Sequence, residues 1–183
     1  MKITKITSIL FIIFLMTTKS FSEEKPKVSS EKYGDWFLEC RTVNKVENCE
    51  LNQLLSLNNT NIRFNLLYSV FKNQENKIKE VFTIVTPLGV NLSVSPALRF
   101  DSGKQYNFRY IKCEAFGCVI SLTNNTTNKE NNDLFDEFIK KLIKSKELEI
   151  AVQGFEEKPF IVKTSLKGFS KGLTQLQKKA SKS

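Results

Sequence analysis

Apolar and polar residues alternate along most of the chain after residue 32, which is the period-two pattern of half-buried β-strands. In the run from Tyr33 to Cys40, Trp36 and Leu38 share one face with Cys40, and Phe37 lies on the other face with Glu39. Polar clusters that read as turns separate the runs. The alternation recurs in segments 49–57, 62–70, 78–85, 106–113, 118–122, 147–155 and 160–166.

Two segments have helical periodicity instead. The first begins at Asp133, after a polar loop over 124–132, and its apolar residues follow the three-and-four spacing of a buried stripe. This stripe consists of Leu134, Phe135, Phe138, Ile139, Leu142 and Ile143. The second, 168–177, places Phe169, Leu173 and Leu176 inward. The elements together predict a mostly-β domain, an antiparallel two-sheet sandwich or jelly-roll-like fold with one or two packed helices.

The N-terminus has the pattern of an export signal. Lys2 and Lys5 precede an apolar run over 6–16, and small residues flank Phe21 at Ser20 and Ser22. This order of basic, apolar and small residues is typical of a cleaved secretory signal. We therefore expect a signal peptide over 1–22, a flexible lead-in over 23–32, one β domain over 33–178 and a tail over 179–183.

The charge pattern argues against nucleic-acid recognition. The chain has 28 basic and 19 acidic residues, a formal net charge of +9, and its basic residues are mostly lysines scattered among acids. Sequence-specific nucleic-acid readers depend on clustered charge and on arginine forks, which are not found in this pattern. We expect no nucleic-acid partner, and membrane association that is peripheral at most, through weak attraction to anionic envelope lipids or polysaccharide.

Four cysteines follow the signal, and an even number in an exported chain indicates disulfide bonds. Four cysteines allow three pairings. Hairpin geometry favours Cys40–Cys49 and Cys113–Cys118, because facing residues of antiparallel strands come close enough to be bridged. Cys40 and Cys49 end two strand-like runs joined by a polar loop over 41–48. Gly117 can supply the positive φ of a tight turn.

Other chemistry for the cysteines fits the sequence less well. A thioredoxin-like redox site uses two cysteines separated by two residues, whereas Cys113 and Cys118 are separated by four. A zinc site needs histidine or further cysteine at short spacing, and the chain contains no histidine. We therefore expect structural disulfides, no metal and no cofactor.

The sequence offers little catalytic machinery. Without histidine, a serine–histidine or cysteine–histidine pair is excluded. Acidic residues gather near the first cysteine pair, at Asp35, Glu39, Glu47 and Glu50. Paired carboxylates could cleave a glycosidic bond, so a hydrolase using Asp35 and Glu39 remains an alternative. Acids between strands are more often solvated, and Trp36 is more consistent with core packing than with sugar stacking.

Several short motifs occur in a characteristic order. They are GDWFLEC at 34–40, Cys49 with Gln53, PLGV at 87–90, the cysteine pair at 113 and 118, and SLKGF at 165–169. In this order the chain resembles the invasion-associated locus B family of bacterial envelope proteins, from Tyr33 to about Gln177. The resemblance implies an exported protein, periplasmic or associated with the outer surface, with no known enzyme chemistry. The family is named after the invasion of red blood cells by a pathogen, and a shared fold does not transfer that virulence role.

The expected function is therefore non-enzymatic: an exported envelope protein that binds a protein or cell-surface partner. One alternative is a periplasmic carrier of a small ligand or lipid, with the interior of the sandwich as its pocket. The carboxylate-based hydrolase is the other.

Overall fold

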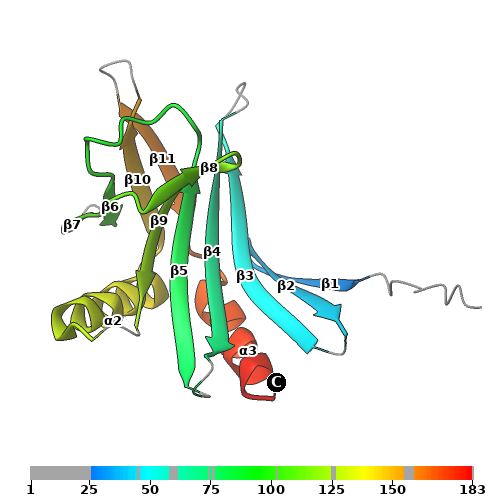
Figure 1. The fold of residues 1–183 in the computed structure, drawn as a ribbon. Helices are drawn as coiled ribbons and strands as arrows, with labels where there is room; N and C mark the ends of the chain where they lie inside the picture. The colour runs from blue at the N-terminus through cyan, green and yellow to red at the C-terminus, as the bar shows by residue number, and fades with distance from the viewer. Residues whose placement is uncertain are drawn as a thin grey trace, which may run out of the picture.

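The computed structural model describes residues 26–44, 46–57, 62–73, 75, 77–101, 103–124, 127–154 and 159–182. It confirms the predicted fold class, since two antiparallel sheets and two helices make up the domain (Figure 1). The signal peptide predicted for 1–22 lies outside the described residues. Among the helices described, none has both the length and the apolar content needed to cross a lipid bilayer.

The larger sheet has seven strands in the order β1-β2-β3-β4-β5-β9-β8. Its first five strands follow one another as antiparallel neighbours, so this part of the sheet is a simple meander. The strands are β1 (Lys27–Tyr33), β2 (Trp36–Val43), β3 (Val46–Ser56), β4 (Arg63–Lys72), β5 (Ile78–Thr86), β8 (Lys112–Glu114) and β9 (Gly117–Thr123).

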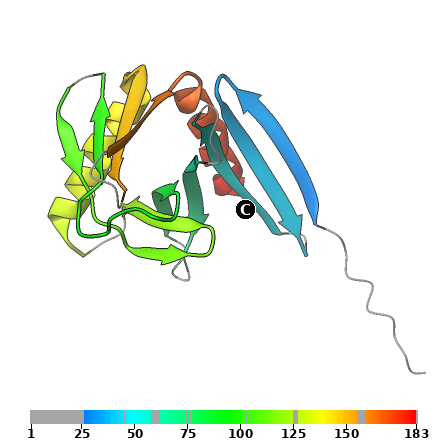
Figure 2. The same ribbon diagram turned by 90° about the horizontal axis from the view of Figure 1, so that it is seen from above.

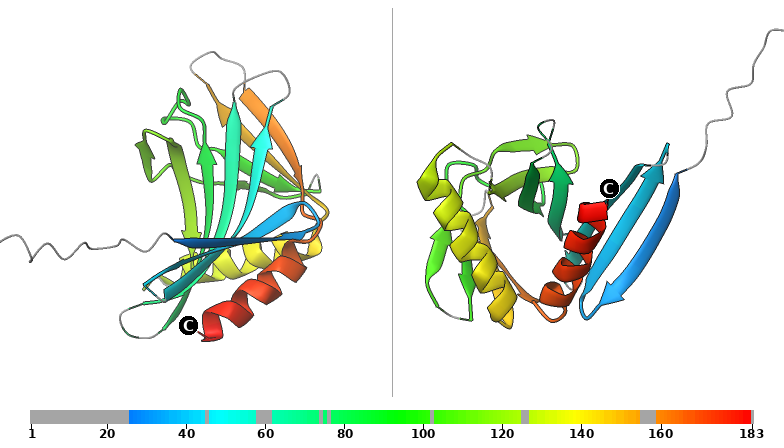
Figure 3. Two further views of the ribbon diagram at one scale, coloured as in Figure 1. Left: turned by 90° about the vertical axis from the view of Figure 1, so that its right-hand side faces the viewer. Right: turned by 90° about the horizontal axis from the view of Figure 1, so that it is seen from below.

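The smaller sheet has four strands in the order β11-β10-β6-β7. Its strands are β6 (Ala97–Phe100), β7 (Gln105–Asn107), β10 (Glu147–Gln153) and β11 (Pro159–Ser165). The helices are α2 (Lys129–Lys144) and α3 (Phe169–Lys182). Figure 2 shows α3 between the hairpin of β1 and β2 and the smaller sheet, and Figure 3 shows both helices along one side of the domain.

The core lies between the sheets and the helices. The alternating residues predicted to face inward do so: Trp36, Leu51, Phe64 and Ile84 have no exposed surface. Phe138 of α2 is equally buried and packs against the rings of four aromatic residues, Phe82, Phe100, Tyr106 and Phe108. Aromatic contacts of this kind stabilise the fold beyond the area they bury.

Two glycines bring distant parts of the chain into backbone contact. Gly34, in the turn between β1 and β2, has a φ of 60°, and Gly168, just before α3, has a φ of 94°. A Cβ atom on Gly168 would overlap the carbonyl oxygen of Tyr33, and one on Gly34 would overlap that of Lys167. Asp35 also donates its backbone N–H to the Lys167 carbonyl over 2.9 Å. The motifs GDWFLEC and SLKGF therefore meet in space.

The lead-in and the tail expected from the sequence are in part structured. Residues 27–32, expected to be flexible, pair with β2 as strand β1, from Lys27↔Thr42 to Tyr33↔Trp36. Their side chains are exposed, so no apolar alternation marked the strand, which is held by main-chain hydrogen bonds. Residues 179–182, expected to be a tail, complete α3, where Lys179 forms an ion pair with Glu47 over 3.4 Å.

Two expected loops are also shorter than predicted. Helix α2 begins at Lys129 rather than Asp133, because the side chain of Asn128 accepts hydrogen bonds from the amides of Glu130 and Asn131 and caps the first turn. The predicted loop 41–48 is strand at both ends, since Val43 pairs with Val46 and the reversal is tight.

The run 106–113 is predicted to form one strand of a hairpin, and this prediction is wrong. Its start belongs to β7 in the smaller sheet and its end to β8 in the larger sheet. Tyr106 and Phe108, which gave the run its alternation, are buried against α2. The alternation therefore marks burial, while the chain passes from one sheet to the other.

The glycine contact can be tested by adding one methyl group. We expect Gly168→Ala to lower the free energy of unfolding by about 3–5 kcal/mol, since the change combines a positive φ with overlap on the Tyr33 carbonyl. Gly89→Ala is the control: its φ is 87° but no atom lies within 4 Å of the new Cβ, so about 1–2 kcal/mol is expected. Urea unfolding measures both, and equal losses would contradict the close contact.

Candidate functional site: a groove between β3 and β4

Strands β3 and β4 are paired along only part of their length. Their register runs from Glu50↔Ser69 to Ser56↔Arg63. Strand β3 continues beyond this point to Val46 and stays paired with β2, whereas β4 continues to Lys72 and stays paired with β5. In Figure 1 the lower part of β3 turns away from β4, and α3 is visible behind the opening. The sheet therefore divides here.

A solvent-accessible groove of about 590 Å³ occupies this opening. Its walls are the diverging ends of β3 and β4, and its floor is the last part of α3, with Leu176, Lys179 and Ala180. The volume falls within the range of ligand-binding sites, about 300–1,000 Å³. Three acidic and three basic residues line it, so the lining carries no formal net charge: Glu39, Glu47, Glu50, Arg41, Lys72 and Lys179.

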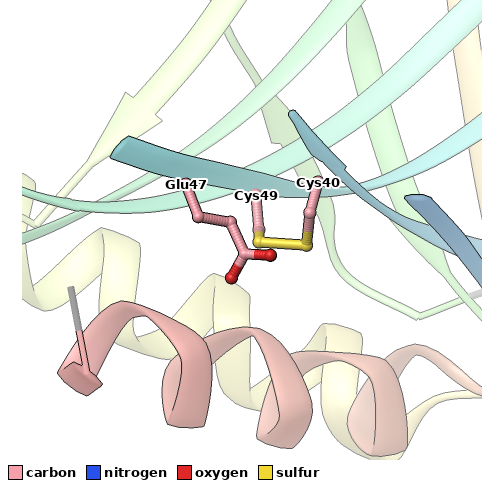
Figure 4. Close-up of side chains that lie close together, drawn as sticks. All are labelled: Cys40, Glu47 and Cys49. Atoms are coloured by element: carbon pink, nitrogen blue, oxygen red, sulfur yellow. A yellow bond between two sulfur atoms is a disulfide. The ribbon is translucent and has the colours of Figure 1, made fainter. Parts of the chain in front are cut away.

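The disulfide Cys40–Cys49 joins β2 to β3 directly beside the groove. Figure 4 shows this disulfide and the carboxylate of Glu47 on the same side of the strands, facing α3. There Glu47 forms its ion pair with Lys179, over 3.4 Å. One covalent bond to β2 and one ion pair to α3 therefore hold the β3 wall of the groove in place.

Cys40, Cys49 and Glu47 lie close enough together for one metal ion, with their candidate ligand atoms within 4.8 Å of one another. The cysteine ligand of a metal ion is the thiolate, however. Both sulfur atoms are committed to the disulfide, which leaves one carboxylate. The cluster therefore has a structural role, because its cysteines link β2 to β3 and its glutamate links β3 to α3.

The second disulfide, Cys113–Cys118, closes the turn between β8 and β9 at the far edge of the same sheet. Gly117 adopts a φ of 143°, in the region that favours glycine. The structure therefore contains both pairings that hairpin geometry favours. Neither cysteine of this second bridge lines the groove.

The acidic residues singled out in the sequence are divided between different places. Glu39 and Glu50 face each other across β2 and β3 at the rim of the groove, and Glu47 faces α3. Asp35 lies in the turn before β2 and does not line the groove. The groove therefore does not bring Asp35 and Glu39 together as a carboxylate pair.

Burial raises the pKa of the Glu50 carboxyl above its usual range. The nearby charge of Arg41 acts in the opposite direction, and that of Glu39 adds to the rise. Trp36, by contrast, is a core residue: it is completely buried and its ring meets that of Phe169 at 4.9 Å. The prediction that Trp36 packs in the core is confirmed.

Sequence reasoning missed most of the groove. The sequence predicts a loop at Val46 and a tail at Lys179 and Ala180, yet all three residues line the groove. The alternation of β3 and β4 ends one residue past the last pair, at Cys49 and Val70, and it reports which face is buried rather than which strands pair, so it carries no sign of the division.

The model of the family "Invasion associated locus B (IalB) protein" matches residues 36–177. The chain belongs to this family. The match includes β2 to β11 and α3 as far as residue 177, and so both walls of the groove and Leu176 of its floor, while Lys179 and Ala180 lie beyond it.

A solved structure supports the same fold. The crystal structure of invasion associated protein B from Bartonella henselae is 20% identical in sequence, with a TM-score of 0.62, and the match covers 84% of this chain and 99% of that chain. At this identity the likeness establishes the fold that IalB proteins share. No curated protein matches this chain.

Removing the first disulfide should destabilise the domain. We expect Cys40→Ser with Cys49→Ser to lower the free energy of unfolding by about 2–3 kcal/mol, because the bridge closes a short loop in the unfolded chain. The matched control, Cys113→Ser with Cys118→Ser, should cost about as much but leave the groove intact, since that bridge lies elsewhere. Urea unfolding measures the cost; an unchanged midpoint in the first variant would contradict it.

Glu50 should make stability depend on pH. A carboxyl whose pKa is raised by folding favours the protonated form, so its contribution to stability falls as pH rises through the folded-state pKa. Glu50→Gln should therefore raise the melting temperature at pH 7, and the gain should shrink as pH is lowered toward 4. Glu75→Gln, at an exposed site in the β4–β5 turn, is the control. A gain at Glu50 that is independent of pH would contradict the burial effect.

Proposed function

We propose that this chain is a non-enzymatic binding protein of the bacterial envelope that holds a partner protein in the groove between β3 and β4. The observation that carries the proposal is the groove itself: a sheet that opens over a helix floor and is braced there by a disulfide and an ion pair. Such bracing keeps the opening in one shape, and a preformed site loses less entropy when it binds.

Export beyond the inner membrane is supported by three features. The N-terminal sequence has the pattern of a secretory signal, both disulfides suit an oxidising compartment, and the chain belongs to the IalB family. Whether the protein acts in the periplasm or at the outer surface depends on where its partner lies.

A binding role fits the chemistry of the groove better than catalysis. The chain has no histidine, and the carboxylates at the groove are spread over its rim and its inner wall. The floor and walls expose apolar groups such as Val46, Phe71 and Ala180 beside charged ones. An apolar centre with a polar rim is typical of protein interfaces.

A small-ligand or lipid carrier is the second candidate, because the groove has the volume of a ligand site. The groove lies at a division of the sheet, whereas the sandwich interior first considered for such a ligand is filled by buried side chains such as Phe82, Leu98 and Ile150. Native mass spectrometry of the protein purified from its host distinguishes the two: a carrier retains a small adduct, and a protein-binding domain does not.

Photocrosslinking from the groove tests the proposal. Phe71, 44% exposed on the groove wall, is replaced by p-benzoylphenylalanine in the native host. We expect one crosslinked product of defined mass. Adding Ala180→Trp should reduce it at least tenfold by filling the groove, whereas Lys171→Trp, on an exposed position of α3 that does not line the groove, should leave it unchanged. No product, or a product insensitive to Ala180→Trp, would exclude the groove as the binding site.

A further inference from the structure

Building on the proposed function, we infer that the partner enters the groove as an extended polypeptide segment that adds a strand to the free edge of β3. The residues that would form the new hydrogen bonds are Glu47 and Cys49, through their backbone N–H and C=O groups. The segment would lie over α3 between β3 and β4.

The direction of these peptide groups follows from the disulfide. The Cα atoms of Cys40 and Cys49 are 4.0 Å apart. Directly opposite residues in antiparallel strands are about 4.5 Å apart when they exchange no hydrogen bonds and about 5.5 Å apart when they do. Cys40 and Cys49 are therefore a pair without mutual hydrogen bonds. The N–H and C=O of Cys49 point away from β2, toward the side of β3 on which β4 lies.

The same reasoning extends along β3 with a period of two. Glu47, Cys49 and Leu51 all direct their peptide groups to the β4 side. Leu51 has a partner there, Tyr68 of β4, because the two strands are still in register at that point. Glu47 and Cys49 lie beyond the last registered pair, Glu50↔Ser69, and have no β4 partner among the described residues.

Strand β4 forms the opposite wall. By the same period of two, the peptide groups of Tyr68, Val70 and Lys72 point toward β3, and Val70 and Lys72 lie beyond the last registered pair. On its side, β3 presents two residues of open edge at the spacing of a regular ladder, and these give a bound strand its hydrogen bonds. This arrangement is that of strand addition, in which main-chain hydrogen bonds supply affinity and side-chain pockets supply specificity.

The lining of the groove describes the segment that fits. Val70, Leu176 and Ala180 form an apolar surface toward the core, which suits an apolar side chain at every second position of the incoming strand. The rim has balanced charges, so the outward side chains are best uncharged and polar. A lipid tail would cover the apolar floor but leave the N–H and C=O groups of Glu47 and Cys49 without partners, which favours a polypeptide.

Amide hydrogen exchange with a defined probe tests the inference. The full oxidised protein is labelled with ¹⁵N and mixed with a capped peptide, Lys-Val-Thr-Val-Thr-Val-Lys, at millimolar concentration. In the free protein the amides of Glu47 and Cys49 should exchange faster than that of Asn48, which points to β2. With the peptide, exchange at Glu47 and Cys49 should slow at least tenfold, while that at Asn48 changes less than twofold. Ala180→Trp should abolish the effect and Lys171→Trp should not.

Two isomers of the probe test main-chain recognition. One is N-methylated on its valines and the other on its threonines, which removes the N–H donors along one edge of the peptide strand and then along the other. With at least one of the two isomers, the amides of Glu47 and Cys49 should exchange as fast as they do without peptide. Strand addition is overturned if the amides of Glu47 and Cys49 are already as slow as that of Asn48 in the free protein, if the parent peptide protects neither, or if both isomers act like the parent.

The outcomes separate this inference from the proposed function. A photocrosslink that depends on Ala180 without amide protection would keep the groove as the binding site and exclude strand addition. A second copy of the chain is another occupant, since β1 also ends the sheet with an open edge. Sedimentation at the concentration of the exchange experiment should show a monomer. A dimer whose formation is blocked by Ala180→Trp would overturn the assignment to a different protein.

Discussion

The close approach of two backbone segments at Gly34 and Gly168 determines where the C-terminal helix lies. Neither residue could carry a side chain without overlapping a carbonyl oxygen of the other segment, and the hydrogen bond from Asp35 to Lys167 fixes their relative position. Helix α3 begins at the next residue, with the Phe169 ring against Trp36 and Tyr68. From this start the helix runs under β1 to β4 and ends beneath the groove. The floor of the groove is thus set by a contact at the opposite end of α3.

The sequence predicted what depends on local alternation and on cysteine chemistry. The inward faces of β2 to β5, the apolar stripe of α2 and both disulfide pairings could be read from residue spacing, because burial has a period and covalent bridges need proximity. Strand β1 could not, since its side chains are exposed and its pairing is made by the main chain alone. The groove could not be read from residue spacing either. The alternation of β3 and β4 reports which face is buried, whereas the groove arises from the end of their mutual pairing, which depends on how the whole sheet twists over α3.

The two motifs that contain glycine, GDWFLEC and SLKGF, have a physical explanation in this contact. Each supplies one residue without a side chain at the crossing and one aromatic ring packed beside it, Trp36 and Phe169. In this chain both motifs therefore place α3 against the sheet. The residues that line the groove contribute differently, because they supply the apolar floor, the ion pair and the strand edges.

The divergence of β3 from β4 also affects how these molecules meet one another. An open strand edge on a flat sheet invites identical chains to pair side by side without limit. Here the free part of β3 is recessed, with α3 below it and β4 beside it, which leaves less room for the edge of a whole neighbouring sheet than for a single strand. The same opening that makes the backbone available thus limits the edge-to-edge pairing of identical chains at this position.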